Sequence, residues 1–336
     1  MTLPRPARPV RVAAGVAALV ALVAACAPSL GQPALRQTPN TAQVFDNSDP
    51  DVLVEAGKTY LFGSSNNMKL PVRPISTFSS NATTTQQEWA RSPRDAMPTR
   101  PAWVDPGEWE IWAPSVVKMG TRFAIYFAAH HKDATTDEAN DQCIGRATSS
   151  APMGPYTPEA TPVYCGMAAE GPAPGLPASN RFGRGALDPE VFRSADGRFH
   201  MVVALSRTAD NIGSVSLNST SGRPVNGLNA RPAILARQSL PWHDGTDDGG
   251  RGASFLENPS MIYEPQTKTY LLFYSAGHWS TRNYNTGFAR CAGPAGPCTL
   301  DTRGPFLKTS PTAGAGSRSG PGGLTVFRSA SGGLMV

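Results

Sequence analysis

The sequence predicts an all-β protein, a five-bladed β-propeller whose last blade is incomplete. A short apolar run, a polar turn and a second apolar run, the pattern of a β-hairpin, recur along the chain. The copies are 62 to 75 residues apart, with no convincing amphipathic helix between them. The chain has 33 glycines and 32 prolines among its 336 residues and only 16% charged residues, which is typical of a turn-rich β protein.

Each copy of the hairpin opens on a proline. The clearest copy is 185–203, in which the turn Asp196-Gly197 separates two apolar runs. A proline that heads an innermost strand costs the sheet no hydrogen bond. Innermost strands of a propeller begin around its central axis, so the residues beside these prolines should face one shared cavity. The prolines are Pro50, Pro114, Pro189, Pro259 and, in a weaker fifth copy, Pro321.

The predicted propeller occupies residues 45–336, and its elements follow from the spacing of the copies. Segments rich in proline, glycine or polar residues separate the apolar runs and are expected to be loops. Because a propeller ring must close, and the sequence ends inside the second strand of the fifth copy, we expect a C-terminally incomplete domain. The expected blades are 45–77, a second beginning at Trp112, 185–235, 254–290 and a fifth beginning near Leu324, and the expected loops are 78–108, 150–184 and 240–253.

Residues 1–26 are predicted to be a lipoprotein signal peptide. Three arginines precede the apolar stretch 12–25, which is too short to span a membrane. Cys26 directly follows Ala-Ala, which resembles a bacterial lipobox and predicts a lipid on Cys26. An ordinary signal peptide with an incidental cysteine is the alternative. Residues 27–44 would then be a flexible tether, and the protein would be extracytoplasmic and membrane-anchored, or otherwise secreted.

The remaining four cysteines suit a disulfide-forming compartment. Three pairings are possible. We favour Cys143–Cys165 and Cys291–Cys298, because each closes a short loop between neighbouring strands. Neither pair shows a zinc-binding pattern, since the sequence has no CxxC and no histidine beside them.

Three carboxylates stand beside the prolines that open the copies. Asp49 and Asp188 directly precede a proline, and Glu257 lies two positions before one. Glycoside hydrolysis uses one carboxylic acid to protonate the leaving oxygen and one carboxylate to activate water. A third carboxylate raises the pKa of the acid, because like charges oppose ionisation. By strand alternation, Asp51 and Glu190 should point away from this site.

Four blade-opening segments resemble those of glycoside hydrolase family 43. They are FDNSDPDVLVEAGKTYLFGS, IWAPSVVKMGTRFAIYF, GALDPEVFRSADGRFHMVV and LENPSMIYEPQTKTYLLFYSAG. The resemblance implies a five-bladed propeller that acts as an inverting arabinanase, arabinofuranosidase or β-xylosidase. It also implies that Asp49 is the general base, Glu257 the general acid and Asp188 the residue that tunes the acid and orients substrate.

Side chains outside the acidic triad are expected to contact the sugar. Trp112 begins the Trp-Ala-Pro motif that the family shares, and Ser115 stands where its arabinanases often have Asp. Trp279 is a candidate because aromatic rings stack on sugar faces. We expect no cofactor and no metal site. A structural calcium ion is conceivable but unsupported, because the acidic loop 240–253 lacks regular ligand spacing.

We therefore expect an inverting glycoside hydrolase that cleaves α-L-arabinofuranosyl linkages in arabinan or arabinoxylan. The alternatives are a β-xylosidase of the same family and a non-catalytic sugar-binding lipoprotein. The expected partners are a plant-type polysaccharide or oligosaccharide and, through Cys26, a membrane. A nucleic-acid partner is not expected, because the net charge of +5 is spread along the chain. A monomer is expected.

Overall fold

The computed structural model describes residues 48–65, 68–75, 94–107, 109–132, 142–165, 185–205, 211–225, 233–236, 240–244, 255–310 and 319–336. They belong to one compact unit, Asn40–Val336. The signal peptide, the tether and Cys26 lie outside the described residues. No described helix is long and apolar enough to cross a membrane.

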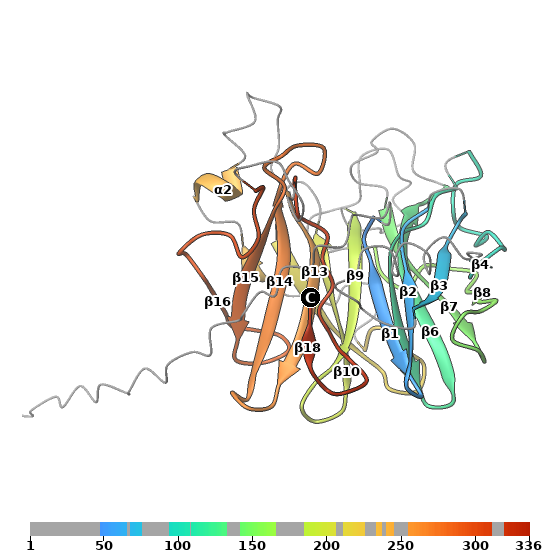
Figure 1. Ribbon diagram of the computed structural model, residues 1–336. Helices are drawn as coiled ribbons and strands as arrows, with labels where there is room; N and C mark the ends of the chain where they lie inside the picture. Colours follow the sequence, from blue (N-terminus) through green and yellow to red (C-terminus); the bar gives the residue numbers. More distant parts are fainter. Residues whose placement is uncertain are drawn as a thin grey trace, which may run out of the picture. The chain divides into compact units, whose positions relative to one another are not determined.

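The described residues form four antiparallel sheets of four strands each, and each sheet follows the order of the sequence (Figure 1). The first sheet contains β1 (Asp51–Glu55), β2 (Lys58–Phe62), β3 (Pro71–Ile75) and β4 (Arg94–Asp95). The second contains β5 (Trp112–Met119), β6 (Arg122–His130), β7 (Gln142–Ser149) and β8 (Thr157–Pro158). The third contains β9 (Ala186–Arg193), β10 (Phe199–Leu205), β11 (Asn211–Leu217) and β12 (Ala233–Ala236). The fourth contains β13 (Phe255–Glu264), β14 (Thr269–Gly277), β15 (Asn285–Cys291) and β16 (Cys298–Leu300).

The sheets pack face to face in the manner of propeller blades. Their innermost strands are in contact, β1 with β5, β5 with β9 and β9 with β13. Three apolar clusters fill the spaces between consecutive sheets. A central strand is therefore covered on both faces, and β6 is buried at every position after Arg122. The one described helix is the four-residue α2 (Pro241–Asp244), inside a segment that the sequence predicted to be a loop.

The first strands of three sheets carry the same irregularity. In the second sheet Trp112 pairs with Ala128, but the next pair is Ser115 with Tyr126, so β5 has one extra residue. The same shift occurs in β9 opposite β10 and in β13 opposite β14. Such β-bulges redirect side chains next to functional sites. Here each bulge coincides with the proline that opens the copy.

The residue before each of these prolines has a left-handed backbone. The φ angles are 49° at Asp49, 43° at Ala113, 52° at Asp188 and 46° at Asn258. Residues with a Cβ rarely adopt this conformation, which costs on the order of 1–3 kcal/mol each. The strain is therefore repeated in every sheet at the end of the axis where the candidate acids lie.

The fifth copy forms a two-stranded hairpin, β17 (Phe327–Arg328) and β18 (Leu334–Met335). The prediction that Pro321 is the fifth equivalent of the repeat prolines is wrong, because the equivalent position lies three residues later in the chain. The amide of Val326 donates to Ser260 Oγ at 2.9 Å, just as the amide of Val191, two residues after Pro189, donates to Ser115 Oγ at 2.8 Å. The position equivalent to the prolines is therefore Leu324. The residue before it is Gly323, whose φ of 66° costs a glycine no strain.

Both favoured disulfides are confirmed. Cys143 and Cys165 are bonded with their Cα atoms 4.2 Å apart, and Cys291 and Cys298 with theirs 3.9 Å apart. The first bond ties the start of β7 to the segment that pairs with it through Ile144 and Tyr164.

Candidate active site

The five copies converge on one small cavity. Its volume is about 30 Å³, which holds about two water molecules but no sugar ring. The prediction that the residues beside the repeat prolines face a shared cavity is confirmed for the first four copies. In the fifth copy it is wrong for Pro321, because Gly323, Leu324 and Thr325 line the cavity instead, and Glu257 is not among the lining residues. The lining residues are Asp49, Pro50, Ala113, Pro114, Asp188, Pro189, Glu190, Asn258, Pro259, Ser260, Gly323, Leu324 and Thr325.

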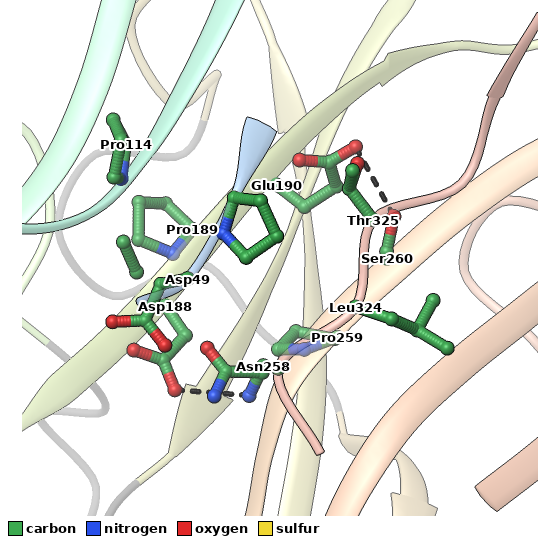
Figure 2. Close-up of a pocket in the computed structure, with 13 residues that line it drawn as sticks. Asp49, Pro114, Asp188, Pro189, Glu190, Asn258, Pro259, Ser260, Leu324 and Thr325 are labelled. Atoms are coloured by element: carbon green, nitrogen blue, oxygen red, sulfur yellow. Dashed lines mark hydrogen bonds between the residues drawn. The ribbon is translucent and has the colours of Figure 1, made fainter. Parts of the chain in front are cut away.

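The lining residues form two polar layers separated by the prolines (Figure 2). Asp49, Asp188 and Asn258 lie on one side, and Glu190, Ser260 and Thr325 lie on the other. Simple strand alternation would place the residues on either side of each proline on the same face. The left-handed residue before the proline and the bulges in β9 and β13 break this alternation and direct the two side chains to different layers. Two of the candidate catalytic carboxylates, Asp49 and Asp188, belong to the first layer, and Glu257 directly precedes Asn258 of that layer.

Asp49 is held by donors from two other parts of the fold. The hydroxyl of Ser64 donates to Asp49 Oδ2 at 2.5 Å and also accepts the backbone amide of Ala113 at 2.8 Å. Hydrogen bonding by the Asn258 side chain also lowers the pKa of Asp49. Burial raises the pKa of Asp49 more than these hydrogen bonds lower it. A carboxylate with a raised pKa is a stronger base once it is ionised.

Asp188 is the most enclosed acid of the first layer. Its Oδ2 accepts the backbone amide of Asn258 at 2.9 Å. Burial raises the pKa of Asp188 well above its usual value, and the charges of Glu257 and Asp49 raise it further. These charge effects show that the three acids predicted from sequence are brought together.

Glu257 has the environment that a general acid needs. Burial raises the pKa of Glu257 to about 7, the charge of Asp49 adds to this increase, and a hydrogen bond from Tyr284 opposes it. A carboxyl with this pKa keeps its proton on much of the protein at neutral pH. Glu257 lies two residues before its proline, whereas Asp49 and Asp188 each lie one residue before theirs. The β-bulge that follows Glu257 in β13 accounts for the position of Glu257 beside Asp49.

The predicted sugar contacts occupy three different environments. Trp112 is half-buried, stands edge-on to His130 with ring centroids 4.6 Å apart, and donates from Nε1 to Glu110 at 3.1 Å. Trp279 is 68% exposed and stacks on His278. Ser115 is only 1% exposed, and its hydroxyl accepts the backbone amide of Val191 in the next sheet. The structure thus places Ser115 in an inter-sheet contact, away from any surface that a sugar could reach.

The second layer holds the carboxyl groups of Asp51 and Glu190. Asp51 Oδ2 accepts the amide of Val116 at 2.6 Å, and Ser260 Oγ donates to Glu190 at 3.4 Å. Burial raises the pKa of Asp51 to about 7 and raises that of Glu190 well above its usual value. Figure 2 shows Glu190 directed away from Asp188 as expected, and the left-handed backbone of Asp188 and the bulge in β9 account for this, because regular alternation would place both on one face. Within the described ranges, no three His, Cys, Asp or Glu side chains are grouped to hold a metal ion.

Two important residues of the site were not identified from the sequence. Tyr284 directly precedes β15, and its hydroxyl accepts Asn258 Nδ2 at 2.6 Å. Its ring lies against the fifth copy at Gly322, where an added Cβ would come within 2.2 Å of the ring. No sequence pattern marks Tyr284. Asn258 could have been singled out, because it occupies the pre-proline position that Asp49 and Asp188 occupy in other copies.

Fold and site together define a β-propeller with a carboxylate triad at one end of its axis. Residues 40–336 match the family described as glycosyl hydrolases family 43, and the chain belongs to that family.

Two curated relatives are similar to the chain. One is an extracellular endo-α-(1→5)-L-arabinanase of Thermotoga petrophila, 31% identical over 193 residues, which are 56% of this chain and 36% of that protein. The other is the extracellular endo-α-(1→5)-L-arabinanase 2 of Bacillus subtilis, 25% identical over 260 residues, which are 74% of this chain and 49% of that protein. The chain thus spans between about a third and a half of the length of these relatives. A thermostable family-43 glycoside hydrolase of known crystal structure shares the fold, with a TM-score of 0.63, 19% identity and coverage of 87% of this chain and 82% of that one.

Proposed function

We propose that the protein is an inverting glycoside hydrolase that cleaves α-L-arabinofuranosyl linkages in arabinan or arabinoxylan. The observation that carries the proposal is the carboxylate triad, in which Glu257 has a pKa of about 7 beside Asp49 and Asp188. Family membership and similarity to two arabinanases support the sugar class.

In the proposed reaction, Asp49 is the general base and Glu257 the general acid. A water molecule attacks the anomeric carbon from the face opposite the leaving group and gives one proton to Asp49. Glu257 gives its proton to the glycosidic oxygen as the bond between that oxygen and the anomeric carbon breaks. The released sugar has the inverted anomeric configuration. Asp188 is proposed to orient the substrate and to tune the acid, and the charge that raises the pKa of Glu257 in the structure is that of Asp49.

The carboxyl groups supply both proton transfers, so the proposed reaction needs no cofactor. Because the axial cavity is too small for a sugar ring, the substrate binds over its mouth. The half-buried ring of Trp112 and the exposed ring of Trp279 are proposed as surfaces for sugar stacking. The proposed ring has five blades, because all five copies line the same cavity and the fifth begins a blade with β17 and β18.

The proposed location is outside the cytoplasm, with a lipid on Cys26. Support comes from the basic start, apolar stretch and Ala-Ala-Cys sequence of residues 1–26. The two arabinanases that resemble this chain are both named extracellular.

The test of the function compares the wild type with Glu257→Gln on debranched arabinan and arabinoxylan. The wild type should release arabinose or arabino-oligomers, and Glu257→Gln should lower the rate by about a hundredfold or more. The matched control is Glu264→Gln, the same change at the far end of β13, where Glu264 pairs with Arg328. Xylose as the main product would indicate the β-xylosidase. Binding of arabinan with no product from the folded wild type would contradict hydrolysis and support a sugar-binding protein.

A further inference from the structure

Asn258 differs from the equivalent residues of the other sheets. At the four strained pre-proline positions, the sequence has two aspartates, an alanine and this single amide. A glycine would adopt the φ of 46° without strain. A strained residue that persists next to reactive groups suggests a function for its side chain.

The hydrogen bonds of Asn258 join it to Asp188 and Tyr284, and its side chain also affects the pKa of Asp49. Its backbone amide donates to Asp188 Oδ2 at 2.9 Å, and its Nδ2 donates to Tyr284 Oη at 2.6 Å. Hydrogen bonding by the Asn258 side chain lowers the pKa of Asp49, and hydrogen bonding by Tyr284 lowers the pKa of Glu257. The side-chain amide has two N–H donors, which matches its two acceptors, Asp49 and Tyr284.

The backbone of the fifth copy lies close to the side chains of Asp49 and Asn258. A Cβ added to Gly323 would lie 3.6 Å from Asp49 Oδ1 and 3.7 Å from Asn258 Nδ2, so the fifth copy comes close to both groups at this glycine. The amide of Gly323 is itself fixed by Ser275 Oγ at 2.7 Å.

We propose that Asn258 is a positioning residue that sets Asp49 directly, and Glu257 through Tyr284, in one hydrogen-bonded frame. The inference rests on the proposed function, because it assigns the base and the acid as above. Asn258 donates to Asp49 and thereby favours the ionised form that can accept a proton from water. The titratable groups facing Asp49 are Asp188, Glu257 and Tyr284, and none of them supplies a positive charge to replace this donor.

The test uses two substitutions that separate the amide from the strain. Asn258→Gly removes both, whereas Asn258→Ala removes the amide and keeps a Cβ at positive φ. Ala56→Gly is the control for strain relief alone, because Ala56 has a φ of 49° in the turn at the far end of β1. Each variant is first shown to unfold cooperatively. Activity on arabinan is then measured against pH, and urea unfolding of the substrate-free protein is measured against pH.

If Asn258 positions the base, both Asn258 variants should move the acidic limb of kcat/KM to higher pH by about one pH unit, because Asp49 loses a donor. Both should also make unfolding more dependent on pH, and this effect should disappear when Asp49 is replaced by Asn. Ala56→Gly should change neither property. The proposal would be overturned if, in both Asn258 variants, the acidic limb of kcat/KM stayed at the wild-type pH and the pH dependence of unfolding stayed unchanged.

The two readouts separate this inference from the proposed function. A wild type that releases no sugar, but whose unfolding shows the coupling between Asn258 and Asp49, would contradict hydrolysis and support the hydrogen-bonded frame. An active wild type with no coupling in either measurement would support hydrolysis and refute the role of Asn258.

Discussion

Replacing Tyr284 by Phe removes one hydroxyl next to the proposed general acid. The hydrogen bond from Tyr284 lowers the pKa of Glu257, which burial raises to about 7. Without this bond the pKa of Glu257 should rise. Glu257 must be protonated to act as an acid, so activity is present below its pKa and is lost as pH rises through it. The alkaline limb of kcat/KM should therefore move to higher pH in Tyr284→Phe.

The expected size of this shift follows from the strength of one hydrogen bond. A hydrogen bond to a charged group is worth about 1.5–3 kcal/mol, and each pKa unit corresponds to about 1.4 kcal/mol. We take the lower end, because water can replace part of the lost bond, and expect a shift of about one pH unit. At pH 8 the wild type should then keep about a tenth of its maximal kcat/KM, and the variant about half.

The assay is the pH profile of kcat/KM on unactivated arabino-oligosaccharides, repeated with a nitrophenyl arabinofuranoside. The nitrophenyl group leaves without full protonation, so its alkaline limb should be weaker if Glu257 is the acid. Tyr270→Phe is the matched control, because the Tyr270 hydroxyl accepts the amide of Ala195 at 2.9 Å at the far end of β14. Two results would refute the assignment of Glu257 as the acid. One is an alkaline limb of kcat/KM in the wild type near the usual pKa of a glutamate, and the other is an alkaline limb at the same pH in Tyr284→Phe and the wild type.

Two predictions concern stability. Burial raises the pKa of Asp51 to about 7 from its usual 3.8, so the folded state binds a proton that the unfolded state has already lost between these pH values. The free energy of unfolding should therefore fall as pH rises from about 4 to 8, and Asp51→Asn should remove up to about 4 kcal/mol of this fall in urea titrations. An equally steep dependence in Asp51→Asn would contradict this reasoning. Phe127→Ala should cost about 3–5 kcal/mol, because the ring is fully buried and stacks on Trp103 with centroids 6.1 Å apart. Thermal melting should show this loss, while the control Val225→Ala, at a 60% exposed side chain, should melt close to the wild type.

The sequence was informative wherever the fold repeats itself. The apolar runs around each turn predicted the hairpins, because alternation and turn chemistry act within a few residues. The prolines predicted which residues would surround the axis, and Asp49, Asp188 and Glu257 do lie together. The cysteine pairs were predictable because short loops limit which sulfur atoms can meet.

The sequence was less informative where sheets meet one another. Pro321 resembles the other marker prolines, yet Leu324 occupies their position, because the amide of Val326 pairs with Ser260 across the sheet boundary. Ser115 follows a proline just as Asp51 does, and only the packing of the third sheet shows that it is buried.

The sequence by itself determined the propeller architecture, the ends of the inner strands and the acids that those ends carry. These features depend on local periodicity, which each copy expresses independently. Only the tertiary structure decided how the acids are held. Tyr284 reaches Glu257 from the start of another strand, and Asn258 links residues that are distant in the sequence. Side-chain hydrogen bonds between sheets have no period along the chain, so they are visible only after the sheets have packed around the axis.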